Sequence, residues 1–326
     1  MADNASGSVA ETKRRSWPVD FMTRLVTEKP LGVVGLVITL VLLFTGIFAD
    51  FLAPYGVNEV HVGLQTQAPS AKYWLGTDNL GRDILSRVIF GARVSVIVGL
   101  TGASVSTLIA LFIGLLSGYI GGTLDLIVQR FVDAVMCLPG LILLIAVIAT
   151  IGQNMWSLIF TLGVVWGIGG SRIIRSAVIG VKENMYVTAT IAVGCPTSRI
   201  LTRHILPNIV ASAIILFSIH VPALILTEAS LSFLGYGIPP PQPSWGSMLG
   251  LMGRTYMFKA PWMVIWPGLA LAIVVYGINM FGDTVRDILD PRLRGGLGRY
   301  GLERKKKLRK KSIDKANKKG TMDRRR

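Results

Sequence analysis

The chain has 326 residues, of which 51% are hydrophobic and 16% charged, and its formal net charge is +16. So apolar a composition argues against an ordinary soluble domain, and the basic charge comes without a nucleic-acid recognition motif. The two cysteines, Cys137 and Cys195, argue against a disulfide scaffold or a paired metal site.

Six apolar runs follow one another along the chain, and each is long enough to cross a membrane. A helix rises about 1.5 Å per residue, so about 20 residues cross a hydrocarbon layer about 30 Å thick. Open sheets cannot satisfy their backbone groups in lipid. The sequence therefore predicts an all-α membrane protein with six transmembrane helices, the first of them a retained span and not a signal peptide. The runs cover residues 31–53, 94–120, 131–151, 155–179, 208–234 and 262–282.

The basic residues predict the orientation. With both termini in the cytosol, 28 of the 34 Lys and Arg residues lie inside or next to the inner side. Six lie outside, and the positive-inside rule favours this arrangement. We therefore expect a cytosolic segment 1–30, a first transmembrane helix 31–53, an extracytoplasmic loop 54–91, a five-helix core 92–286 and a basic cytosolic tail 287–326.

Two outer segments have turn chemistry. In "GTDNLGRD", residues 76–83, Gly76 and Gly81 suit a tight turn, and Asp78 is a plausible helix cap. In the proline-rich run 237–247, Trp245 suits an interfacial anchor. Both segments are candidates for a docking surface, with ordinary loop packing as the alternative.

Residues 183–206 predict a cytosolic hairpin of two short helices, each too short to cross a membrane. Gly194 permits a sharp reversal, and Pro196 fits the first turn of the second helix. The second helix is amphipathic, with Ile200, Leu201, His204 and Ile205 on one face and Arg199, Thr202 and Arg203 on another. Periodicity alone leaves two functions open, a connector resting on lipid headgroups and a docking element for a cytosolic partner.

The fifth run is the most polar of the six. Ser212, Ser218, His220 and Glu228 are its candidates for a translocation path or gate, because polar groups at membrane depth are costly and often functional. Two of them also have a structural interpretation. Glu228 could cap or pair with a residue of segment 75–93, and His220 could be a hydrogen-bonded structural histidine. Arg130 and Asp133 are expected to form an interhelical pair. The three histidines form no convincing catalytic or metal-binding set.

The hairpin resembles a known loop. Thr188-Ala189-Thr190, then Gly194, then Ile205-Leu206-Pro207 are similar to the "EAA…G…ILP" loop of ABC importer permeases. Thr188 stands where the family has Glu and Thr190 where it has Ala, so the resemblance implies docking through shape more than through a charge. Longer stretches resemble the second permease of dipeptide, oligopeptide and nickel importers: "LGTDNLGRDILSRVIFGARVSV", "RFVDAVMCLPGLILLIAV", "LTEASLSFLGYGIPPPQPSWGSML" and "FGDTVRDILDPRLR".

The resemblance implies a type I ABC importer permease fold with cytosolic coupling helices, in a bacterial inner membrane. It implies a non-catalytic subunit that forms a path for di- or oligopeptides by alternating access. The expected partners are a homologous permease, two ABC ATPases, an extracytoplasmic binding protein and membrane lipid, with no nucleic acid. The implied ATPase-coupling residues are Thr188, Ala189, Thr190, Gly194, Arg199, Leu206 and Pro207.

No cofactor is expected on this chain. The sequence has no G-x-x-x-x-G-K-[ST] motif, so ATP and Mg²⁺ are expected on the partner ATPases. Nickel or another small solute remains an alternative cargo. A stand-alone channel or ion-coupled carrier is the alternative class, but it needs mid-membrane charge relays and no docking hairpin. The basic tract 299–326 is expected to be a solvated tail that helps to set topology, or a site for anionic lipid.

Overall fold

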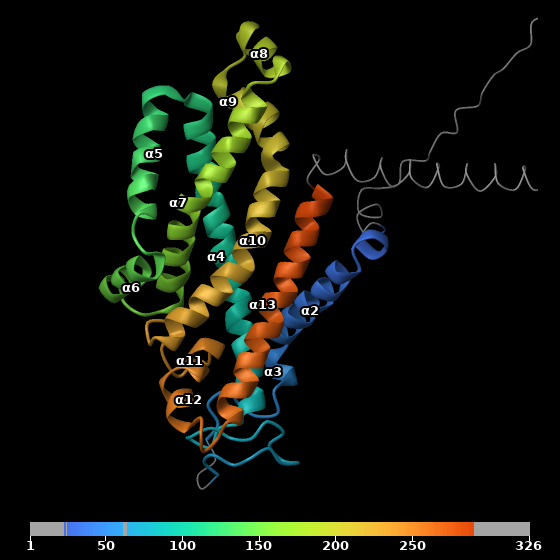
Figure 1. The fold of residues 1–326 in the computed structure, drawn as a ribbon, viewed down its shortest axis with the longest axis vertical. Helices are drawn as coiled ribbons and strands as arrows, with labels where there is room; N and C mark the ends of the chain where they lie inside the picture. The colour runs from blue at the N-terminus through green and yellow to red at the C-terminus, as the bar shows by residue number, and fades with distance from the viewer. Residues whose placement is uncertain (1–22, 24, 61–63, 290–326) are drawn as a thin grey trace, which may run out of the picture.

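The computed structural model describes residues 23, 25–60 and 64–289, and within these ranges the protein is a bundle of long helices (Figure 1). The only strand-like pairing in the described chain is an isolated bridge between Thr77 and Asp83. The short helices α8 and α9 lie at one end of the bundle, and α11 and α12 lie at the other. Residues 1–22 and 24 of the predicted segment 1–30, and residues 290–326 of the predicted tail 287–326, fall outside the described residues.

The helices follow one another in this order: α2 (Pro30–Ile47), α3 (Ala49–Leu52), α4 (Ile84–Ile120), α5 (Gly122–Met136), α6 (Gly140–Ile151), α7 (Met155–Lys182), α8 (Met185–Ala192), α9 (Thr197–Arg199), the π-helix η1 (Ile200–Ile205), α10 (Leu206–Phe233), α11 (Trp245–Leu249), α12 (Leu251–Tyr256) and α13 (Trp262–Leu289).

Five helical stretches of the described chain are long and apolar enough to cross a membrane, and α5 with α6 makes a sixth if the bent pair is one span. The prediction of six spans is therefore confirmed at the level of architecture. The prediction of one continuous third helix over 131–151 was wrong. Helices α5 and α6 meet at 90°, and residues 137–139 separate them. Pro139 lacks a backbone N–H and cannot continue the helix, which accounts for the break.

The second span starts earlier than predicted. Helix α4 begins at Ile84, inside the expected outer loop 54–91, because the Asp83 carboxylate caps it by accepting the Ser86 N–H at 2.7 Å. Asp78, the predicted cap, instead closes the preceding turn by accepting the N–H groups of Leu80 at 2.8 Å and Arg82 at 2.9 Å.

Glycines bring α4 and α7 into close contact along the bundle. A Cβ atom on Gly114 would lie 2.6 Å from the Ser171 carbonyl oxygen, and one on Gly167 would lie 2.8 Å from the Ser106 carbonyl oxygen. Small residues on both helices allow this approach, which is how helices associate where lipid removes the hydrophobic driving force. Helix α2 packs against α13 in the same way, with Gly35 beside Gly277.

Ion pairs attach α5 to α7. The Arg175 guanidinium donates to Asp125 at 2.5 and 2.6 Å, and the Asp125 carboxylate also accepts the Ser117 hydroxyl of α4. Asp133 pairs with Arg172 of α7. The expected interhelical pair of Arg130 and Asp133 was wrong, because these residues lie one turn apart on α5, with 3.7 Å between Arg130 Nη1 and Asp133 Oδ2.

Candidate functional site

The hairpin projects from the bundle as a compact unit (Figure 1). Its first helix, α8, buries Val187 completely but leaves Met185 89% exposed, and Val193, which follows the helix, is 87% exposed. Large apolar side chains with that much exposure are costly at a water-facing surface unless a partner covers them. This end of the molecule therefore presents an apolar contact surface.

The reversal after α8 depends on Gly194. Its φ is +81°, in the left-handed region that favours glycine. The Gly194 N–H donates to the Ile191 carbonyl at 2.9 Å, and the Cys195 N–H donates to the Thr190 carbonyl at 3.2 Å. These two bonds form a Schellman motif, which closes the carbonyl end of α8 and fixes the direction of the second helix.

The second half of the hairpin is seated on the bundle by two isoleucines five residues apart. Ile200 and Ile205 are both buried, because η1 is a π-helix whose wider turn brings positions i and i+5 to one face. They pack in one apolar cluster with Val187 and with residues of α4, α7 and α10. Arg199 and Arg203 remain exposed.

The implied coupling residues lie mostly on the outer side of this unit. Five of them are exposed, namely Thr188, Ala189, Gly194, Arg199 and Pro207. Thr190 is half-buried, and its hydroxyl donates to the Val187 carbonyl at 2.7 Å. Leu206 packs against the cluster at the base of the hairpin, where α10 begins. The hairpin is thus joined directly to α10, without an intervening loop.

A cavity of about 670 Å³ lies between the α5–α6 bend, α7 and α10. Its wall is apolar over most of its area, and none of the side chains that line it is Asp, Glu, Lys or Arg. The lining residues are Val135, Met136, Leu138, Gly140, Leu141, Leu143, Leu144, Val165, Trp166, Gly169, Gly170, Ile173, Leu216, Ile219, His220, Leu226, Thr227 and Ser230.

His220 is fixed in the wall of this cavity. Its Nδ1 lies 2.7 Å from the Ser106 hydroxyl of α4, and its ring meets Trp166 edge-on with 5.5 Å between centroids. Gly170 of α7 provides the space, since a Cβ there would lie 3.0 Å from His220 Cε1. Three helices therefore set the position of one polar ring at the cavity.

The other predicted path residues lie elsewhere. Ser212 and Ser218 are half-buried and do not line this cavity, and the Ser218 hydroxyl donates to the Ile215 carbonyl at 2.8 Å. The Glu228 side chain is 1% exposed and accepts the Ser232 hydroxyl at 2.6 Å. Its carboxyl group also lies within hydrogen-bonding reach of the Ser244 hydroxyl. Glu228 thus holds the segment before α11 against α10.

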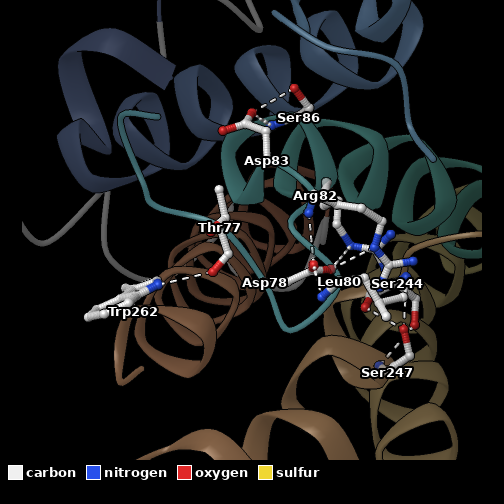
Figure 2. A network of polar contacts seen from close by, with 10 residues as sticks. Thr77, Asp78, Leu80, Arg82, Asp83, Ser86, Ser244, Ser247 and Trp262 are labelled. Atoms are coloured by element: carbon white, nitrogen blue, oxygen red, sulfur yellow. Dashed lines mark hydrogen bonds and ion pairs between the residues drawn. The ribbon is translucent and has the colours of Figure 1, made fainter. Parts of the chain in front are cut away.

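The segments around residues 76–86 and 244–262 carry a network of polar contacts (Figure 2), at the end of the bundle opposite α8 and α9 (Figure 1). The Arg82 Nε donates to Asp78 at 2.7 Å, and the Trp262 indole donates to the Thr77 carbonyl at 3.2 Å. Ser244 and Ser247 cap α11 reciprocally. These contacts attach the loop before α4 to the start of α13.

The prediction that Trp245 is an interfacial anchor was wrong. Its side chain is 2% exposed, and the indole N–H donates to the Val88 carbonyl of α4 at 3.0 Å. The sequence also gave no reason to select Ser106 or Trp166. Both lie within long apolar runs, and only the packing of α4, α7 and α10 brings them to His220.

Comparison with known families finds two matching models. Residues 110–295 match the family described as binding-protein-dependent transport system inner membrane component. Residues 20–69 match the N-terminal TM domain of oligopeptide transport permease C.

Curated relatives cover most of the chain. A dipeptide transport system permease protein of Alkalihalophilus pseudofirmus is 36% identical over 267 residues, covering 82% of this chain and 88% of the relative. An oligopeptide transport system permease protein of Bacillus subtilis is 36% identical over 277 residues, covering 84% and 90%. Among solved structures, an inward-facing MetNI methionine ABC transporter chain matches with a TM-score of 0.52 at 18% identity, covering 64% of this chain and 98% of that one. The fold of this chain is therefore similar to that of an ABC importer permease.

Proposed function

Because this chain belongs to the family of binding-protein-dependent transport system inner membrane components and is a permease of an ABC importer, we propose that its cargo is a di- or oligopeptide. The relatives named as dipeptide and oligopeptide permeases support this cargo. The cavity between the α5–α6 bend, α7 and α10 is compatible with this cargo, because apolar walls with a few fixed polar groups are typical of sites for small organic ligands.

In this proposal the hairpin 183–206 transmits motion from the ATPases. Its exposed Met185 and Val193 would enter a recess of the ATPase, and Gly194 would keep the two helices at their fixed angle. Coupling requires a rigid connection between the docking element and the path. Helix α10 supplies it, since it starts at Leu206 in the base of the hairpin and carries His220 at the cavity.

Docking through shape fits the side chains of α8. Thr188 is uncharged and exposed, and its neighbour Ala189 is small and exposed. The coupling residues Thr188, Ala189, Thr190, Gly194, Arg199, Leu206 and Pro207 therefore form a surface whose only formal charge is Arg199. Of the proposed path and gate residues Ser212, Ser218, His220 and Glu228, His220 is the one that lines the cavity.

The assembly we propose has a second, homologous permease, two ATPases that bind ATP and Mg²⁺, and an extracytoplasmic binding protein. The hairpin end would face the cytosol of a bacterium, across its inner membrane from the outer network. The segment 1–30, the hairpin and the tail 287–326 would be cytosolic, with 31–53 as the first span and 92–286 as the core. The loop 54–91 would be extracytoplasmic, except that helix α4 already begins at Ile84.

Another cargo and another class of transporter both fit the structure less well. Nickel or another small solute would need ligands on the path, and the described residues contain no group of three or more His, Cys, Asp or Glu side chains that could hold a metal ion. A stand-alone channel or ion-coupled carrier would leave the hairpin without a role.

The proposal is tested by isolating the native complex and identifying its subunits, then measuring uptake of labelled peptides by the complex in proteoliposomes. We expect two ATPases, a second permease and a binding protein, and uptake that requires ATP. Uptake of nickel with no uptake of any peptide in a library from two to eight residues would overturn the peptide assignment. Recovery of the chain without an ATPase would overturn the coupling role of the hairpin.

A further inference from the structure

The cavity is bounded partly by irregular backbone. Between α5 and α6 the chain leaves helical geometry at residues 137–139, and Leu138 and Gly140 on either side of Pro139 line the cavity. Leu138 is 52% exposed, so this backbone is not enclosed by the chain itself. Non-helical backbone at membrane depth is tolerated where it is buried in protein or lines a water-filled cavity, and not where it faces lipid. This backbone must therefore face water, cargo or another protein chain, and not lipid.

Gly140 and Leu141, at the start of α6, line the cavity. The N–H groups of Gly140, Leu141 and Ile142 have no partner within the helix, because the first intrahelical bond runs from the Leu143 N–H to the Pro139 carbonyl at 3.1 Å. No side chain caps this helix start. A helix N-terminus carries a partial positive charge and favours an anion such as a carboxylate.

His220 is a second, independent donor at the same cavity. Its side chain is 4% exposed, and its Nδ1 is engaged by the Ser106 hydroxyl. Nε2 has no hydrogen-bonding partner among the described residues, and it is not one of their fully buried unpaired polar atoms, so it is accessible at the cavity that His220 lines. When the Ser106 hydroxyl donates to Nδ1, Nε2 carries the proton and donates into the cavity.

The remaining wall fits an apolar side chain. Trp166, Leu141 and Gly169 are among the residues that line it. A Cβ atom added to Gly169 would have no atom within 4 Å, so there is free space at that point of the wall. We propose that the cavity binds the carboxylate end of a peptide, with the N–H groups at the start of α6 and the His220 Nε2–H as donors and the apolar wall around the adjacent side chain. This inference rests on the peptide cargo of the proposed function and names the part of the peptide that is bound.

The test measures binding to the purified importer complex, with its ATPases and second permease present and the binding protein left out. The probe is the dipeptide Ala-Phe, compared with its C-terminal amide. Binding is followed by the change in tryptophan fluorescence on adding the probe. The change measured in a Trp166→Phe complex is subtracted, which leaves the contribution of Trp166. We expect Ala-Phe to bind at least tenfold more tightly than the amide.

A matched pair of variants isolates the helix donors. Gly140→Pro removes one N–H at the first helical position, where proline is tolerated, and the extended backbone of Pro139 (φ −58°, ψ 119°) is compatible with a following proline. Gly140→Ala keeps the N–H, and its Cβ would meet no atom within 4 Å. We expect Gly140→Pro to weaken binding of Ala-Phe about tenfold more than binding of the amide, and Gly140→Ala, which keeps the N–H, to leave the ratio of the two affinities as it is in the wild type.

A second pair isolates His220. The double variant Ser106→Ala with His220→Phe removes both partners of the buried hydrogen bond and keeps a ring against Trp166, whereas Ser106→Ala alone keeps the imidazole. We expect only the double variant to reduce the preference for the free carboxylate. Equal binding of Ala-Phe and its amide, or a Gly140→Pro effect of the same size on both, would overturn the inference, as would no binding of either probe at millimolar concentration. Peptide uptake by the complete system remains a separate measurement, so failure of the carboxylate site is distinguishable from failure of the peptide assignment.

Discussion

Trp245 occupies the space that a side chain on Gly91 would need, since a Cβ on Gly91 would lie 2.7 Å from Cδ1 and Nε1 of the indole. The same indole donates to the Val88 carbonyl at 3.0 Å. Helix α11 is thereby held against the start of α4, at the end of the molecule opposite the hairpin (Figure 1). A single ring joins the outer segment to the bundle.

We expect Gly91→Ala to lower the free energy of unfolding by about 1–3 kcal/mol, the usual cost of adding a carbon to a filled site. Gly180→Ala is the matched control, because a Cβ at Gly180 meets nothing within 4 Å and alanine favours the helix. The measurement is the midpoint of thermal unfolding of the two purified variants in detergent. Equal midpoints would show that Trp245 moves aside at no cost.

Two substitutions at Gly194 distinguish the effect of backbone strain from the effect on docking. Its φ of +81° makes any other residue strained, by about 1–2 kcal/mol, while the space around it is open. Gly194→Ala and Gly194→Glu should therefore lose similar stability. Only Gly194→Glu should also lose co-purification of the ATPases and ATP-driven transport. A Gly194→Glu complex that keeps its ATPases and transports as well as Gly194→Ala would contradict the docking role.

The Asp125–Arg175 pair should be coupled more strongly than the Arg130–Asp133 pair. Asp125 is mostly buried and accepts two bonds from the guanidinium at 2.5 and 2.6 Å, whereas the Arg130 side chain is 77% exposed. A double-mutant cycle with alanine should give about 1–3 kcal/mol for the first pair and about 0.5 kcal/mol or less for the second. Equal coupling energies in urea unfolding would contradict a stabilising link between α5 and α7.

Glu228 should tolerate an isosteric replacement. In Glu228→Gln the amide oxygen still accepts the Ser232 hydroxyl, so we expect transport to stay above about half of the wild-type rate. Glu228→Ala leaves buried hydroxyls unpaired and should lower the free energy of unfolding by about 1–3 kcal/mol. Loss of transport in a stably folded Glu228→Gln protein would instead show that the charge meets cargo or closes a gate.

Local patterns in the sequence predicted the long helices and the hairpin well. Apolar runs report span length directly, and the reversal at Gly194 has a residue that tolerates φ > 0. The faces of the second hairpin helix also followed from spacing, with Ile200 and Ile205 buried and Arg199 and Arg203 exposed.

Features that depend on contacts between distant segments could not be predicted in the same way. The break after Met136 lies in a continuous apolar run, where only Pro139 signals it. The burial of Trp245 depends on a glycine far away in α4. The contact between His220 and Ser106 requires the arrangement of α4 and α10, which no periodicity in either helix reports.

The π-helix η1 keeps the hairpin in register with α10. Its wider turn holds one residue more than an α-helical turn, so the extra residue is absorbed without rotating the segments on either side of it. Ile200 and Ile205, five residues apart, therefore face one apolar cluster, as two residues four apart would in an α-helix. Deleting Thr202 would let the turn close as an α-helix with both isoleucines still on that face, so the direction of the hairpin does not depend on the extra residue.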